Sequence, residues 1–104
     1  MATAVYVFGQ MKVKDYDTYL KTYGVPFYEV LQQYNGTLLS ATKRGMTLEG
    51  KPFGNWTVLA RFETAEDAGA FYQSAAYAPL KKLRLEELTE GAQAFSFPAE
   101  IPEL

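Results

Sequence analysis

Tyrosine, arginine and carboxylate side chains carry the potential chemistry of this sequence, because its 104 residues include neither histidine nor cysteine. Their absence excludes zinc sites built from Cys and His, haem held by an axial His or Cys, and catalytic triads that depend on His. We therefore expect no cofactor and no stoichiometric zinc or haem. An acid–base step near neutral pH would need a carboxylate, a lysine or a tyrosine.

A cluster in the second half of the chain combines aromatic rings, hydroxyls and a positive charge: Tyr72, Ser74, Tyr77 and Arg84. Arg84 follows Tyr77 by seven residues, about two turns of a regular helix, so their side chains can share one face. Together with Tyr23, the cluster would line a substrate-binding pocket in which Arg84 clamps an anionic group. The alternative is structural: the tyrosines belong to the core, the serine interrupts a helix, and Arg84 pairs with Glu87 or Glu29.

Three residues are predicted to be catalytic: Glu49, Arg61 and Tyr77. Glu49 lies in a glycine-flanked loop and would act as a base at a cleft mouth; the alternative is a solvated turn residue. Arg61 lies in an otherwise apolar segment, where it would bind a ligand carboxylate or enolate. Its alternative is a salt bridge with Glu63, Glu49 or Glu90. Tyr77 would orient the substrate or move a proton.

Asn55 and the single tryptophan, Trp56, form a second predicted substrate-binding pair. An aromatic or quinone-like ring would stack on the indole and form one hydrogen bond with the amide. The alternative places Trp56 in the core or at a dimer interface. A stripe of tyrosines at helical spacing has a structural interpretation, with rings buried between helix and sheet and hydroxyls reaching water: Tyr16, Tyr19, Tyr23 and Tyr34.

Four strands and two helical regions must position these candidates. Alternating apolar residues predict strands over 4–13, 37–42, 55–62 and 92–97. Helical spacing predicts helices over 15–34 and 64–88, with Asp15 and Thr64 as their N-caps. Pro26 predicts a kink or two pieces in the first region, and Pro79 starts a second piece in the other. Gly91 predicts a break before the last strand.

The order of these elements is that of the ferredoxin-like α+β fold, a four-stranded antiparallel sheet with both helices on one face. One such domain would occupy residues 1–97, followed by an extended tail over 98–104 that contains two prolines. Both faces of the sheet are apolar, yet the helices can cover only one. One face holds Tyr6, Phe8, Leu59, Phe95 and Phe97; the other holds Val5, Val7, Met11, Trp56, Val58 and Phe62. We expect the uncovered face to pack on the sheet of a second copy, which makes a homodimer.

Several short motifs, in this order and spacing, resemble the domain of unknown function 1330 family of the dimeric α+β barrel superfamily. They are Gly36 with 37–39, Leu48-Glu49-Gly50, Phe62 with Ala68 and Tyr72, and the run 72–77 followed by Leu80 and Arg84. The resemblance covers about residues 4–97 and implies the fold and the dimer described above, without a defined reaction. Related branches of the superfamily include quinol-type and haem-binding enzymes. The haem branches bind iron through His, which this chain lacks.

Charge and hydropathy narrow the functional classes. The net charge of −2 disfavours nucleic-acid binding, and no apolar run is long enough to span a membrane. The N-terminus does not resemble a signal peptide, so we expect a cytoplasmic location. The predicted function is small-molecule binding by a homodimer, with cofactor-independent acid–base or oxygenation chemistry on an aromatic, enol or quinol-like substrate if it is an enzyme. The alternative is a non-catalytic ligand sensor or a structural protein.

Overall fold

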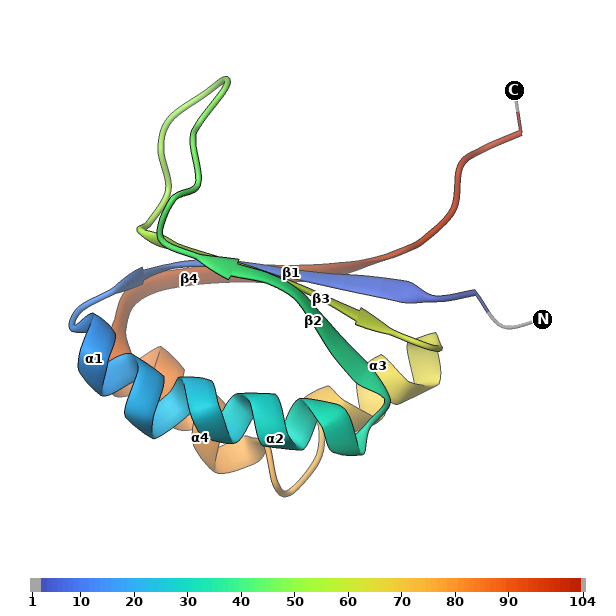
Figure 1. The fold of residues 1–104 in the computed structure, drawn as a ribbon, viewed down its shortest axis with the longest axis horizontal. Helices are drawn as coiled ribbons and strands as arrows, with labels where there is room; N and C mark the ends of the chain where they lie inside the picture. The colour runs from blue at the N-terminus through green and yellow to red at the C-terminus, as the bar shows by residue number, and fades with distance from the viewer. Residues whose placement is uncertain (1–2, 104) are drawn as a thin grey trace.

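The computed structural model describes residues 3–103 and shows one layer of helices packed on one sheet (Figure 1). In chain order the elements are β1 (Val5–Val13), α1 (Tyr16–Tyr19), the π-helical turn η1 (Leu20–Gly24), α2 (Val25–Gln33), β2 (Gly36–Thr42), β3 (Trp56–Phe62), α3 (Ala65–Tyr72), α4 (Ala78–Leu83), the π-helical turn η2 (Arg84–Leu88) and β4 (Thr89–Pro98). Within the described residues, no helix has both the length and the apolar character to cross a membrane.

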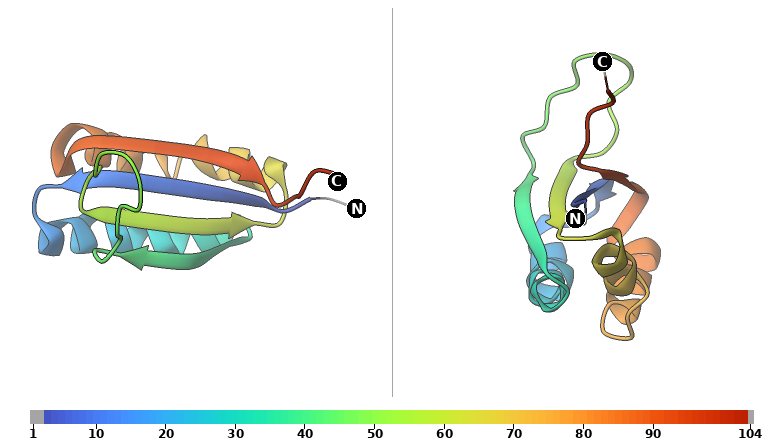
Figure 2. Two further views of the ribbon diagram at one scale, coloured as in Figure 1. Left: turned by 90° about the horizontal axis from the view of Figure 1, so that it is seen from above. Right: turned by 90° about the vertical axis from the view of Figure 1, so that its right-hand side faces the viewer.

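The sheet has the strand order β2-β3-β1-β4, and all neighbouring strands are antiparallel. The view from above in Figure 2 shows the four strands lying over the helical layer, with the opposite face of the sheet open. The predicted ferredoxin-like α+β fold is therefore confirmed. Because β1 and β3 are central, with Val7 opposite Ala60, their inward-facing residues form the floor beneath the helices.

Alternation along the central strands decides what is buried. Val5, Met11 and Val13 of β1 are buried against the helices, as are Trp56, Ala60 and Phe62 of β3. The intervening side chains, such as Tyr6 and Phe8, are only partly buried because they stand on the open face. The largest fully buried side chains are Tyr19, Leu31 and Phe62, which places the centre of the core between the first helical region and β3.

Both helical regions begin where the sequence predicts, but the side chain of only one of the two predicted N-cap residues caps its helix. The Thr64 hydroxyl accepts a hydrogen bond from the Asp67 backbone N–H at 3.0 Å, which caps α3. Asp15 precedes α1, but its carboxylate accepts from the Thr18 hydroxyl at 2.9 Å instead of capping a backbone amide. Pro26 lies in the first turn of α2 and has no N–H to donate, and the helix continues before it through the π-helical turn η1.

The prediction that Gly91 breaks the chain before the last strand is wrong. β4 already begins at Thr89, and Gly91 lies within it, opposite Lys12 of β1. A glycine is tolerated there because β4 is an edge strand, paired on one side only. The register shifts between Lys12 and Val13, next to this glycine.

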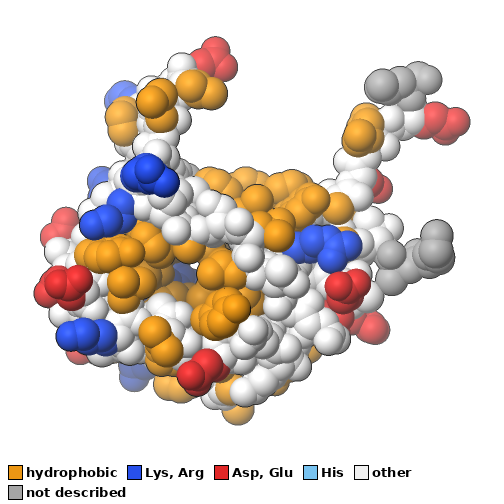
Figure 3. Space-filling model, viewed as in Figure 1, with side chains coloured by type: hydrophobic (Ala, Val, Ile, Leu, Met, Phe, Trp, Pro, Cys, Tyr) orange, Lys and Arg blue, Asp and Glu red, His pale blue; other side chains and the backbone are white. Residues whose placement is uncertain are grey.

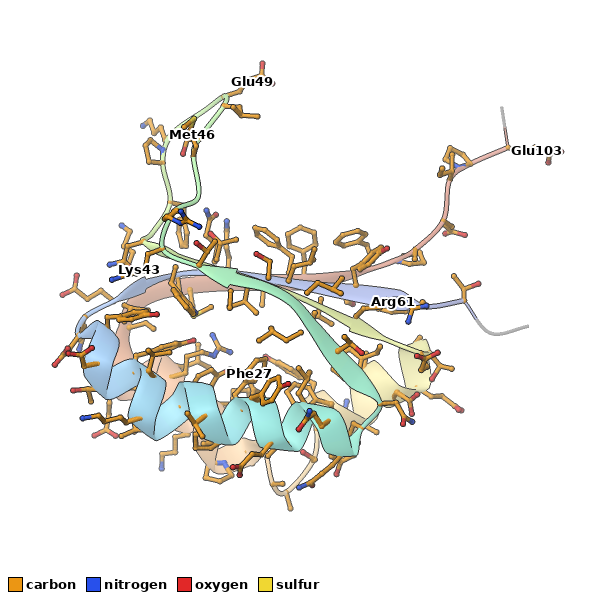
Figure 4. The ribbon with its side chains drawn as sticks, viewed as in Figure 1. Phe27, Lys43, Met46, Glu49, Arg61 and Glu103 are labelled. Carbon is orange, nitrogen blue, oxygen red and sulfur yellow. The ribbon has the colours of Figure 1, made fainter. Side chains whose placement is uncertain are left out.

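Two segments extend from the sheet on the side away from the helices. They are the 43–55 connection between β2 and β3 and the chain after Pro98 (Figures 1 and 4). Both carry large apolar side chains that are more than four-fifths exposed in this chain: Met46, Leu48 and Ile101.

Candidate functional site

A cavity of about 60 Å³ lies between the sheet and the helical layer. Its floor consists of small and apolar residues of β1, β3 and β4, among them Val7, Gly9, Val58, Ala60 and Ala94. Aromatic rings from both helical regions form its walls: Tyr19, Tyr23 and Phe27 on one side, Phe71, Tyr72 and Tyr77 on the other. Figure 4 shows Phe27 pointing from α2 toward the sheet. Arg84 is the only charged residue in the lining.

Arg84 is buried to an unusual degree for an arginine, with only 4% of its surface exposed. Its Nε atom has no hydrogen-bond partner. The only ion pair among residues 3–103 joins Arg61 to Glu63, so neither Glu87 nor Glu29 neutralises Arg84. The guanidinium instead lies 5.9 Å from the centroid of the Tyr23 ring. Burial removes hydration from the guanidinium, and the described chain offers it the Tyr23 ring and tyrosine hydroxyls but no carboxylate.

Two tyrosine hydroxyls meet beside the guanidinium. The Tyr23 and Tyr77 oxygens are 2.7 Å apart and form a buried hydrogen bond in which either can be the donor. One proton of the pair is used in this bond, and the other is free to be donated elsewhere. With the N–H groups of Arg84, the site therefore presents several donors and no carboxylate acceptor.

Local backbone features place these side chains. Tyr23 lies in η1 and Arg84 opens η2, so each helical region presents a cavity residue from a π-helical turn. Such turns are rare and occur frequently at functional sites. The Thr89 hydroxyl donates to the Arg84 carbonyl at 2.8 Å, which satisfies an acceptor at this turn. Ser74 donates to the Phe71 carbonyl and accepts from the Tyr77 N–H, so it shapes the turn that orients Tyr77.

Burial raises the pKa of two of the cavity tyrosines, Tyr19 and Tyr23. It raises the pKa of Tyr23 well above the usual value, and the nearby Tyr77 and Tyr19 raise it further. Burial likewise raises the pKa of Tyr19, although Arg84 opposes this effect. For Arg84, burial acts to lower the pKa, but Tyr23, Tyr77 and Tyr19 together outweigh it and the pKa is raised. At neutral pH the site consequently holds neutral hydroxyls and one positive charge.

The structure brings together one part of the predicted site. Tyr23, Tyr72, Tyr77 and Arg84 all line the cavity, and Ser74 supports it from behind. Tyr72 is 43% exposed and stands at the rim, with the Lys81 ammonium 4.3 Å from its ring centroid. The pocket interpretation of this cluster thus has a geometric basis, whereas the alternative, a pairing of Arg84 with a glutamate, is absent from the described residues.

Two residues predicted to be catalytic lie elsewhere. Glu49 is exposed in the long loop between β2 and β3, far from the helical layer (Figure 4). Arg61 alternates with Ala60 and Phe62, so it stands on the open face of the sheet. There it pairs with Glu63 at 3.3 Å, as its alternative interpretation anticipated.

Asn55 and Trp56 have structural roles in this chain. The Asn55 side chain accepts from the Val13 N–H at 2.8 Å and donates to the Val13 carbonyl at 3.0 Å. It thereby fastens the end of the loop to β1. Trp56 is buried and its ring packs edge-on against Tyr16 and Tyr19. Neither side chain lines the cavity.

Three aromatic residues that the helical layer contributes to the cavity walls were not among the predicted site residues: Tyr19, Phe27 and Phe71. Tyr19 had only a structural interpretation, as part of the tyrosine stripe between helix and sheet. Their signal was available in the spacing: Tyr19, Tyr23 and Phe27 follow one another at four-residue intervals, which places them on one helix face. The rings of Tyr23 and Phe27 are in fact stacked, with centroids 5.4 Å apart.

The fold and cavity define a ferredoxin-like α+β protein with an internal space between sheet and helices. The chain belongs to the family described as domain of unknown function 1330, whose model matches residues 4–94. No curated protein matches it.

Solved structures with the same fold share little sequence with the chain. One is a protein of unknown function from Rhodopseudomonas palustris, with 12% identity and a TM-score of 0.75 over 98% of this chain and 86% of the other. A NIPSNAP family protein from Agrobacterium tumefaciens has 15% identity and a TM-score of 0.60 over 90% of each chain. A candidate antibiotic biosynthesis monooxygenase from Nitrosomonas europaea has 10% identity and a TM-score of 0.61, with 98% and 95% covered. At these identities the similarity shows the fold alone.

Proposed function

We propose that this protein is a homodimer that binds a small organic anion in the cavity between sheet and helices, one per subunit. The observation that carries the proposal is Arg84, a buried guanidinium with no carboxylate within reach among the described residues and an unpartnered Nε. Unsatisfied buried polar groups in native proteins call for an explanation, and an absent ligand is one of the established explanations. A carboxylate or enolate oxygen would supply the missing acceptor and charge.

The site is better suited to binding and to stabilising an oxyanion than to removing a proton. The described lining contains no carboxylate that could take up a proton; its polar side chains are the tyrosine hydroxyls and the Arg84 guanidinium. Glu49, which would have served as a base, is in a distant loop. If an enol or quinol-like compound is the substrate, Arg84 and the Tyr23–Tyr77 pair would stabilise its oxyanion. The alternative is a non-catalytic sensor of the same ligand.

A titration tests the anion site. Isothermal titration calorimetry with acetate and benzoate should show binding to the wild-type protein. The substitution Arg84→Gln should lower affinity by about 10- to 100-fold, the loss expected for a charge-assisted hydrogen bond. The matched control is Arg61→Gln, which removes an arginine from the other face of the sheet and should leave affinity unchanged. Equal affinity of the wild type and Arg84→Gln would overturn the proposal.

The open face of the sheet supports the homodimer. Aromatic side chains of β1 and β4 stand there in cross-strand pairs, with ring centroids 5.4 Å apart for Tyr6 and Phe97 and 5.3 Å for Phe8 and Phe95. In the single chain, 56% of the surface of Phe95 is exposed. Figure 3 shows orange apolar side chains gathered along the top of the sheet and on the two segments that rise beside it. A second copy would cover these surfaces and remove their apolar area from water.

Sedimentation tests the dimer separately from the ligand. At micromolar concentration we expect a mass of twice 11.7 kDa. The substitution Phe95→Lys should give monomers, because it would bury a charge in the interface. Leu85→Lys is the control, since Leu85 is about equally exposed but belongs to η2 in the helical layer. A stable wild-type monomer at this concentration contradicts the sheet-on-sheet dimer.

A further inference from the structure

A second, larger cavity adjoins the one that contains Arg84. It is a groove of about 630 Å³ between α3 and the strands β1 and β4. Val7, Phe71, Tyr72 and Ala94 line both spaces, so the groove and the inner cavity meet at these four residues. The groove has the volume of a typical small-molecule site, whereas the inner cavity accommodates only a few non-hydrogen atoms.

The two spaces differ in chemistry. The inner cavity holds one positive charge, Arg84, and the tyrosine hydroxyls. The groove has no charged residue in its described lining, and its α3 wall is made of the small residues Ala65, Ala68 and Gly69. A ligand that fills both must therefore have a compact anionic end and an uncharged, apolar remainder.

The charge and size of the inner cavity define the anionic end. A single guanidinium balances one negative charge, and no second cation lines the space. A carboxylate has three non-hydrogen atoms and can accept two parallel hydrogen bonds from a guanidinium. A doubly charged phosphate would be larger and would remain half neutralised. Most of the residues that line the groove are apolar, with Gln73 and Ser96 as uncharged polar exceptions, so the groove suits an apolar chain.

We infer that the ligand is a monocarboxylate with an apolar chain, whose carboxylate meets Arg84 while the chain lies in the groove along α3. This inference rests on the proposed function of the Arg84 cavity and extends it to the rest of the ligand. Tyr72 stands where chain and carboxylate join, because its ring borders both spaces. Its contact with the Lys81 ammonium, 4.3 Å from the ring centroid, holds it at that border.

Gly69 provides a way to block the groove without disturbing the fold. A Cβ built at Gly69 has no neighbour within 4 Å, and its φ is not in the left-handed region. The residue lies within α3, where alanine and leucine have a higher helix propensity than glycine. Gly69→Leu should therefore fold and extend its side chain into the groove, and Gly69→Ala is the matched control that adds only a methyl group.

The experiment is calorimetric titration with acetate, butanoate, hexanoate and octanoate, together with octan-1-ol as the uncharged analogue. For the wild type, affinity should rise about threefold to fourfold for each added methylene while the groove fills, and octan-1-ol should bind much more weakly than octanoate. Gly69→Leu should weaken octanoate at least about tenfold and change acetate less than twofold, whereas Gly69→Ala should resemble the wild type. Circular dichroism confirms that each variant is folded.

The outcomes separate this inference from the proposal beneath it. If acetate binds in an Arg84-dependent manner but chain length or Gly69→Leu has no selective effect, the groove is not the site of the chain and this inference is overturned, while the anion site stands. If octanoate binds Arg84→Gln as tightly as the wild type, or if no carboxylate binds, both are overturned.

Discussion

Each face of the sheet has aromatic side chains and one arginine next to it, but these residues differ in burial and in their partners between the two faces. On the covered face, Phe62 is fully buried and Arg84 reaches in from the helical layer to a position that is 96% buried and without a counterion. On the open face, Phe95 is more than half exposed and Arg61 has paired with Glu63 in contact with water. The contrast shows that the layer covering a residue, and not its type, determines whether its side chain is buried or exposed.

The largest expected difference between the faces concerns stability. Phe62→Ala should lower the free energy of unfolding by about 3–5 kcal/mol, because it removes a fully buried ring and enlarges the space between sheet and helices. Phe95→Ala should lower it by about 1 kcal/mol or less at concentrations low enough to populate monomers. Urea unfolding followed by circular dichroism measures both. Equal losses would mean that the open face is as tightly packed in solution as the core.

Arg84→Met should raise the stability of the ligand-free protein while it abolishes anion binding. Replacing the guanidinium by an apolar side chain of similar length removes the buried Nε that has no hydrogen-bond partner, and leaving such a group unpaired costs about 1–3 kcal/mol. A thermal-shift assay with and without acetate measures both effects. A destabilised Arg84→Met protein would show that the described chain already compensates this charge.

Alkaline pH should lower the free energy of unfolding, because two tyrosines on the covered face are buried. Tyr19 and Tyr23 stay protonated in the folded state at pH values where the unfolded chain ionises, because burial raises the pKa of each. Their contribution to stability is complete below about pH 10 and falls by about 1.4 kcal/mol per pH unit for each tyrosine above it.

Urea unfolding between pH 9 and pH 11 measures this slope. Tyr23→Phe should reduce it by about half, whereas Tyr28→Phe, at an exposed position of α2, should keep the wild-type slope. An unchanged slope in Tyr23→Phe would argue against burial of its hydroxyl in solution.

The smallest effect is expected for the exposed arginine. Arg61→Ala removes one partner of a surface ion pair with Glu63, in which both side chains are more than a third exposed. Such pairs contribute about 0–1 kcal/mol, and the contribution decreases with added salt. A loss above 2 kcal/mol, or one insensitive to salt, would mean that Arg61 has a partner in the dimer.

Most strands and helices could be predicted from patterns of residues close together in the sequence. Alternation in 4–13 and 55–62 placed Val5 and Phe62 on one face of the sheet, because a strand repeats every two residues; the structure shows that the helices cover this face. Thr64 predicted the start of α3 because an N-cap hydrogen bond joins residues only three positions apart, here the Thr64 hydroxyl and the Asp67 N–H. The predicted break at Gly91 was wrong: a glycine weakens a strand in general, but the edge strand β4 tolerates it.

For the candidate site, too, some features follow from the sequence and others only from tertiary contacts. The sequence by itself determined that a side chain acting as acid or base near neutral pH is a tyrosine, a lysine or a carboxylate, because His and Cys are absent. It also indicated that Tyr77 and Arg84 could share a helix face. Only the tertiary structure decided that Arg84 turns inward through η2 to meet Tyr23 from the other helical region, and that Arg61 and Glu49 lie elsewhere. Depth and partnership depend on contacts between residues 54 or more positions apart, as for Tyr23 and Tyr77, and such contacts leave no periodic trace along the chain.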